Sequence, residues 1–94
     1  MIEFTDDDNG YMAWLAANPT GFVVNARAVA GPNYMVLHRA SCRFISAPRD
    51  EGAYTGRGYH KVVSACLDDL RTYAKSIGRS DGSFSQTCGH CAPQ

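Results

Sequence analysis

Apolar positions divide this chain into a few elements separated by turn-forming residues. In residues 5–18 the side chains of Tyr11, Trp14 and Leu15 recur at intervals of three and four positions, which places them on one face of a helix. Thr5, with an acidic residue three positions later, resembles a capping box at the start of such a helix. An Asn-Pro pair ends it, because a residue before proline disfavours helical geometry. The pattern therefore predicts a short N-terminal helix.

Two runs rich in β-branched and aromatic residues come next. Residues 21–28 (GFVVNARA) and 34–39 (YMVLHR) are separated by a Gly-Pro-Asn turn signal, so we expect them to pair as an antiparallel hairpin. Residues 43–46 have the composition of a further short strand. Residues 47–58 contain one proline and three glycines, which indicates a loop.

The most regular apolar pattern covers residues 59–77. Its apolar side chains form a continuous stripe at helical spacing, and Gly78 is suited to end the helix as a C-cap. The stripe consists of Val62, Val63, Cys66, Leu67, Leu70, Tyr73 and Ala74. We predict one long helix here that supplies most of the core, with Leu67 and Leu70 nearly fully buried.

Two closely spaced pairs of metal-binding residues are the strongest chemical signal in the chain. Three residues separate His38 from Cys42, and two separate Cys88 from Cys91. Zinc prefers four nitrogen or sulfur donors in tetrahedral geometry, and such paired spacing is typical of a structural zinc site. We predict that these four residues hold one zinc ion and close the C-terminus onto the middle of the fold. A site in which Cys66 replaces His38 remains the alternative.

The two other histidines are not expected to bind the metal. His90 lies between the cysteines of the C-terminal pair and should point away when both cysteines point toward the ion, and His60 has no partner at ligand spacing. Four protein ligands leave no coordination position open for a substrate, which favours a structural metal over a catalytic one. The sequence therefore predicts an α+β domain with a small antiparallel sheet, one short N-terminal helix, one long helix and a zinc-clamped C-terminus.

Length and charge limit the classes of function. The 94 residues form a single domain, 1–94, or one excised from a longer protein, and a core of this size gains from a metal. Nine basic and nine acidic side chains give zero net charge, which argues against strongly electrostatic binding to nucleic acid or membranes. We see neither a transmembrane stretch nor a signal peptide, so we expect a cytoplasmic protein with reduced cysteines. In an exported chain the cysteines would instead form two disulfides.

Positive charge is concentrated in the middle of the chain. From His38 to Lys61 there are five basic side chains and two acidic ones. Within this stretch, residues 54–61 (YTGRGYHK) combine two glycines, cations and flat tyrosine rings next to an expected helix N-terminus, which suits a phosphate or a nucleotide. We therefore predict nucleic acid binding by Arg39, Arg43, Tyr54, Arg57, Tyr59 and Lys61. A protein-interaction module with a purely structural zinc is the competing interpretation, an enzyme comes third, and a membrane partner is not expected.

Overall fold

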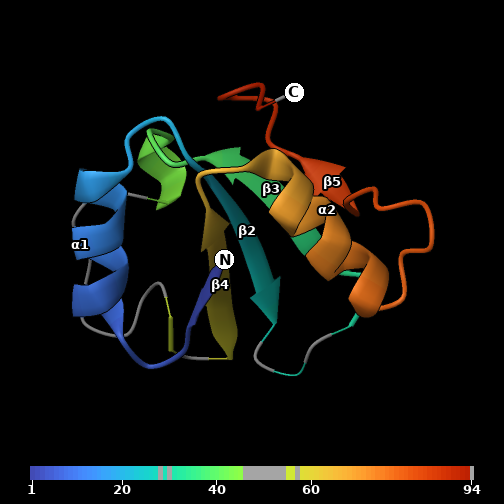
Figure 1. The fold of residues 1–94 in the computed structure, drawn as a ribbon. Helices are drawn as coiled ribbons and strands as arrows, with labels where there is room; N and C mark the ends of the chain where they lie inside the picture. Colours follow the sequence, from blue (N-terminus) through green and yellow to red (C-terminus); the bar gives the residue numbers. More distant parts are fainter. Residues whose placement is uncertain (28, 30, 46–54, 57, 94) are drawn as a thin grey trace.

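A mixed sheet separates two helices in the computed structural model, which describes residues 1–27, 29, 31–45, 55–56 and 58–93 (Figure 1). The elements in chain order are β1 (Ile2–Phe4), α1 (Asp8–Ala17), β2 (Phe22–Arg27), β3 (Met35–Arg39), the 3₁₀ helix η1 (Arg43–Ile45), β4 (Tyr59–Ser64), α2 (Leu67–Ser76) and β5 (Gln86–Thr87). The strand order is β1-β4-β2-β3-β5. All neighbouring strands are antiparallel except β3 and β5, which are parallel. The α+β class and the β2–β3 hairpin are thus confirmed.

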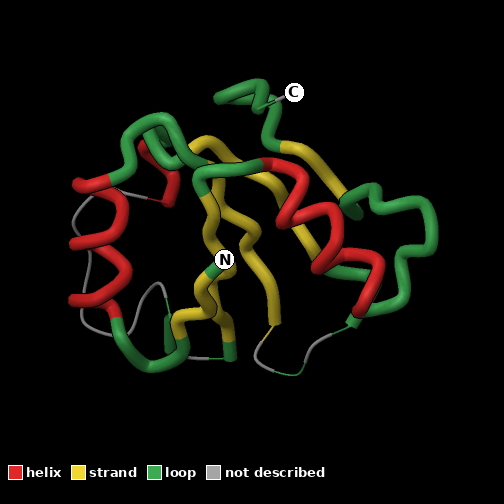
Figure 2. Tube along the Cα trace, in the orientation of Figure 1, coloured by secondary structure: helices red, strands yellow, loops and turns green. Residues whose placement is uncertain are grey.

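The two helices cover opposite faces of the sheet (Figure 2). On β2 and β4, Val23 pairs with Val63 and Val24 pairs with Val62. The first pair belongs to an apolar cluster shared with α1, and the second belongs to a cluster shared with α2. All four valines are completely buried, because successive residues of a strand point to opposite faces and both faces are covered.

The prediction of one long helix over residues 59–77 is wrong for the first third of this range, where the chain forms strand β4. Helix α2 begins only at Leu67. Because β4 lies between β1 and β2 and is covered on both faces, it is apolar at consecutive positions. Such a run cannot be distinguished from a buried helix by periodicity alone. Leu70 is fully buried as expected, whereas Leu67 is half-buried and Cys66 is exposed.

The helix ends follow local capping rules. The Asp7 side chain, and not that of Thr5, caps α1 by accepting a hydrogen bond of 2.9 Å from the backbone N–H of Gly10. Past the end of α2, Gly78 adopts a positive φ of 117°, which confirms it as the residue that ends this helix.

Two remaining expectations concern the segments after β3. The short strand expected over residues 43–46 is instead the 3₁₀ helix η1. Of the loop expected over residues 47–58, only three residues lie within the described part of the chain. No helix in the described ranges is long and apolar enough to cross a bilayer.

Candidate metal centre

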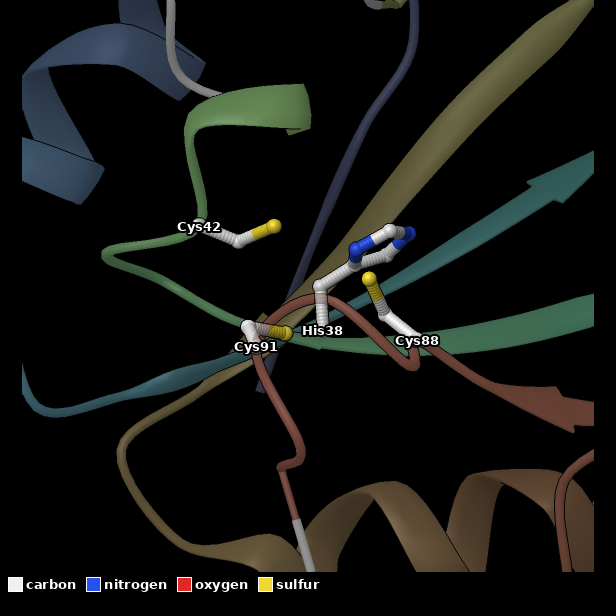
Figure 3. Close-up of side chains that lie close together, drawn as sticks. All are labelled: His38, Cys42, Cys88 and Cys91. Carbon is white, nitrogen blue, oxygen red and sulfur yellow. The ribbon is translucent and has the colours of Figure 1, made fainter.

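The four predicted metal ligands come together at one end of the sheet. Figure 3 shows the side chains of His38, Cys42, Cys88 and Cys91 converging, and their ligand atoms all lie within 4.8 Å of one another. All of these cysteines are free thiols. In a tetrahedral site with zinc–sulfur bonds of about 2.3 Å, sulfur atoms lie about 3.8 Å apart. Small side-chain rotations are therefore enough to close this cluster around an ion.

The parallel pairing of β3 with β5 brings the two halves of the site together. Leu37 pairs with Thr87, and the backbone N–H of Cys88 donates to the carbonyl oxygen of Leu37 over 2.9 Å. Cys88 is thereby placed beside His38, the residue that follows Leu37. On the other side, a tight turn after β3 places Cys42, whose N–H donates to the carbonyl oxygen of Arg39 over 3.0 Å. The sequence separation of about fifty residues is thus spanned by one strand pair.

Backbone N–H groups point at the sulfur atoms, as in many structural metal sites. Burial alone raises the pKa of the Cys88 thiol, but hydrogen bonds from the backbone of Cys91 and His90 and from neighbouring thiols hold this pKa below its ordinary value. The sulfur of Cys91 accepts a hydrogen bond of 3.3 Å from the backbone N–H of Arg39. These bonds favour the thiolate, which is the form of cysteine that binds a metal.

Burial disfavours the thiolate form of Cys42 in the absence of a cation. Burial raises its pKa to about 11, and the nearby sulfurs of Cys91 and Cys88 act in the same direction, against a lowering contribution from the backbone of Phe44. Three sulfur atoms gathered in a partly buried space repel one another as thiolates. A bound divalent cation would remove this repulsion.

His38 fits the role of the nitrogen donor. Its side chain is 7% exposed, and among the described residues its Nδ1 atom has no hydrogen-bond partner. A buried polar atom without a partner is costly, and a bond to a metal would satisfy it. Burial, together with the charge of Lys61, lowers the pKa of His38 to about 4. The imidazole is therefore neutral at pH 7, as metal binding requires.

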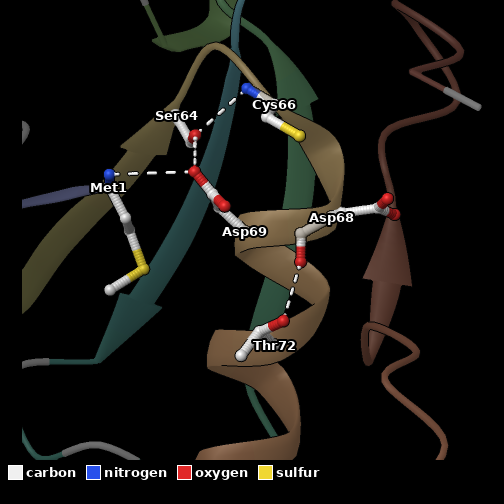
Figure 4. Close-up of polar contacts among 6 residues, drawn as sticks. All are labelled: Met1, Ser64, Cys66, Asp68, Asp69 and Thr72. Atoms are coloured by element: carbon white, nitrogen blue, oxygen red, sulfur yellow. Dashed lines mark hydrogen bonds and ion pairs between the residues drawn. The ribbon is translucent and has the colours of Figure 1, made fainter.

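The alternative site with Cys66 does not match the geometry. Cys66 is exposed and lies outside the cluster, at the start of α2, where its backbone N–H donates to Ser64 Oγ over 3.0 Å (Figure 4). Ser64 Oγ in turn donates to Asp69 over 2.8 Å, in the same network. His90 also lies outside the cluster, as expected, and its ring packs edge-on against Phe44.

Those predicted nucleic acid-binding residues that the structure describes do not form one surface. Phe22 pairs with Arg39 at one end of β2, and Arg27 pairs with Tyr59 at the other end. Five residue steps along β2 separate these ends by about 16 Å. Arg39 is therefore near the metal ligands, and Tyr59 is at the far end of the sheet.

The predicted nucleic acid-binding residues also differ in their exposure and in their contacts. Lys61 is 3% exposed and lies under α1, 5.9 Å from the centre of the Tyr11 ring. Arg39 is exposed, but its guanidinium donates to the carbonyl oxygens of Cys91 and Ala92 over 3.1 and 3.0 Å and so holds the C-terminal tail. Arg43 is exposed next to the metal ligands. Tyr54 and Arg57 lie outside the described residues.

An exposed aromatic pair beside the ligands was missed by the sequence analysis. Phe44 is 53% exposed, and its ring centre lies 4.6 Å from that of His90. Phe44 follows Cys42 by two positions, and His90 lies between Cys88 and Cys91. We call Arg43, Phe44 and His90 the knuckle surface. The available signal was their position beside the ligands: Arg43 and Phe44 directly follow Cys42, and His90 lies between two cysteines that point toward the ion.

Comparison of the chain with models of protein families, with curated protein sequences and with solved structures gave no significant match. The fold and the geometry of the site are therefore the basis for the proposed function.

Proposed function

We propose that this chain is a zinc-stabilised, non-catalytic recognition domain that binds unpaired bases of nucleic acid through its knuckle surface. The observation that carries this proposal is the exposed ring of Phe44, held against His90 by the two halves of the metal centre.

Zinc is the metal that the donor set favours. Three thiolates and one imidazole are soft donors, which exclude magnesium and calcium and suit tetrahedral zinc. Four protein donors complete the coordination shell, so the ion has no open position for substrate or for an activated water. Thiolates keep this form in a reducing compartment, which supports an intracellular site of action.

The metal would fix the shape of the knuckle surface. Phe44 belongs to the segment that follows Cys42, and His90 belongs to the turn between Cys88 and Cys91, so one ion ties both rings to the same point. Leaving a phenylalanine ring half-exposed forgoes stabilisation from burial. An aromatic face next to an arginine is a common platform for a stacked base.

The experiment measures binding of a short fluorescently labelled single strand and of the matching duplex by anisotropy, at several salt concentrations. Base stacking on an aromatic ring contributes about 1–3 kcal/mol, so Phe44→Ala should weaken single-strand binding by about 5- to 150-fold. Arg43→Gln should reduce the slope of log affinity against log salt by about 0.7.

Val29→Ala is the matched control, because Val29 is an exposed apolar residue (87%) outside the metal centre. It should bind like the parent. Equal affinity of Phe44→Ala and the parent, at equal zinc content, would contradict the proposal. If no strand binds at low salt, the neutral net charge and the exposed Phe44 would favour a protein partner for the same surface.

A further inference from the structure

A second group of polar and aromatic side chains lies at the opposite end of the sheet from the metal centre. The guanidinium carbon of Arg27 lies 4.6 Å from the ring centre of Tyr34 and 4.9 Å from that of Tyr59. The two ring centres are 6.0 Å apart and the rings are tilted by 56°. With the rings this close together, the guanidinium lies over the pair and not between them. Arg27 is an exposed residue, so its guanidinium is accessible from solvent.

The directions of the hydrogen bonds follow from a lysine that can only donate. Lys61 Nζ lies 2.8 Å from Asn25 Oδ1, which fixes the orientation of the Asn25 amide. The Asn25 Nδ2 group then donates to the hydroxyl oxygen of Tyr34 over 3.3 Å. The hydroxyl oxygen of Tyr59 likewise accepts from Arg27 Nη1 over 3.3 Å. Both tyrosine hydroxyls are thus acceptors inside the group, and each keeps its own proton to donate.

Within the described part of the chain, this group contains donors that have no acceptor. A guanidinium carries five N–H donors, and among the described residues only one hydrogen bond from Arg27 is formed, to Tyr59. Within the same ranges, Arg27 has no ion pair, and no acceptor is found for the hydroxyl of Tyr34 or Tyr59. Two rings also hold the guanidinium in place, which lowers the entropy lost when a ligand binds.

We propose that Arg27, Tyr34 and Tyr59 form a binding site for a phosphate group. Several acceptor oxygens on one phosphate match the fork of the guanidinium and the two hydroxyl protons, and such charge-assisted bonds are strong. The site goes beyond the proposed function, because it shares no residue with the knuckle surface and does not depend on base stacking there.

The test is a titration of the zinc-loaded chain, residues 1–94, with inorganic phosphate, followed by NMR of the backbone and of the Arg27 Nε–H group. Sodium chloride at the same ionic strength is the reference. The parent should show saturable shifts at Arg27, Tyr34 and Tyr59. Arg27→Gln should weaken binding by about tenfold or more, because a hydrogen-bonded charge is lost. Tyr34→Phe keeps the ring under Arg27 but removes a donor, and should weaken binding severalfold. Because it also removes the acceptor of the Asn25 amide, it should lower the melting temperature slightly, and the titration is run well below that temperature.

Arg71→Gln is the matched control. Arg71 is an exposed arginine on α2 that pairs with Asp68 over 2.8 Å, so the variant removes the same charge at a distant place. It should bind phosphate like the parent. The proposal is overturned if phosphate gives no saturable shifts, if Arg27→Gln binds like the parent, or if Arg71→Gln weakens binding as much as Arg27→Gln does.

A second titration with a nucleoside monophosphate distinguishes the sources of the phosphate. Tighter binding than inorganic phosphate would identify a nucleotide as the ligand, and equal binding would identify the phosphate group alone. Both results support the site. A failure of the Phe44→Ala test with a positive result here would remove the proposed function and leave the phosphate site standing.

Discussion

Removal of the metal should unfold the layer of the protein that contains α1. The apolar cluster on this face includes Ala40, Cys42, Ile45 and Cys88, which all lie in the segments that carry the ligands. The hydroxyl of Tyr11 on α1 donates to the carbonyl oxygen of Ile45 over 2.6 Å, which links the helix to the same segment. A chelator, or Cys88→Ser, therefore removes a tie on which the packing of α1 depends.

The magnitude follows from the size of the domain. Structural zinc contributes about 10–16 kcal/mol at pH 7 to small domains that fold around it. A chain of 94 residues has a total stability of about 5–14 kcal/mol. The contribution of the metal is thus as large as the whole stability, so the metal-free chain should not hold its native α1 face at ambient temperature.

Trp14 provides the assay. It is the single tryptophan of the chain and packs against the same cluster. Chelation should shift its fluorescence to longer wavelength, abolish the cooperative thermal transition, and be reversed by zinc. Elemental analysis of the purified protein should give one zinc per chain. Cys66→Ala is the control and should keep the zinc and the melting temperature, because Cys66 is exposed and outside the cluster.

Two results would refute this reasoning. The first is a protein that contains no zinc in reducing buffer, or whose melting temperature is unchanged by a chelator. The second is loss of zinc in Cys66→Ala with retention in His38→Ala, which would reverse the assignment of the nitrogen donor.

Two further predictions concern the face covered by α2. Leu70 is fully buried, so Leu70→Ala should lower the free energy of unfolding by about 2–5 kcal/mol. Leu67 is half-buried, so Leu67→Ala should lower it by only about 1 kcal/mol. Equal losses for the two variants in chemical denaturation would contradict the boundary between β4 and α2. Burial lowers the pKa of His60 below its ordinary 6.5, against the opposing charge of Glu3, so the unfolded chain binds this proton more readily. The stabilising contribution of neutral His60 should therefore be present above pH 6.5 and be lost as the pH falls below it. With zinc in excess, His60→Leu should show a smaller decline in the free energy of unfolding at low pH than the parent does. Parallel curves of unfolding free energy against pH for the two proteins would show that His60 does not titrate in this way.

The convergence of the four candidate metal ligands was predictable because their signal is local. Two residues between Cys88 and Cys91, and three between His38 and Cys42, let each pair meet one ion through a single turn. That these two pairs meet depends on the contact between β3 and β5, which is a property of the tertiary fold. The sequence nevertheless indicated that they would combine, because it contains few other soft donors. The choice between His38 and Cys66 needed the structure, because Cys66 lies in a stretch whose apolar pattern has two interpretations.

The same stretch shows what the sequence could not decide. Val62 and Val63 are adjacent and both completely buried, which a strand between two helices permits and a surface helix does not. Lys61 looked like a surface cation because it is charged. Its burial depends on where α1 lies relative to β4, and that is a property of the tertiary fold.

Two of the positions that depart from the rule of buried apolar and exposed charged side chains lie beside the proposed binding surfaces. Lys61 is 3% exposed, and Phe44 is 53% exposed. Exchanging a buried charge for an apolar residue of similar volume is often stabilising, and burying a phenylalanine ring is favourable, so stability alone does not account for either residue. Each adjoins one of the two proposed binding surfaces: Lys61 orients the Asn25 amide that donates to the Tyr34 hydroxyl, and Phe44 presents its ring beside the metal centre. Departures of this kind are expected where a fold gives up stability for recognition, which is why both ends of this sheet are the places to look for ligands.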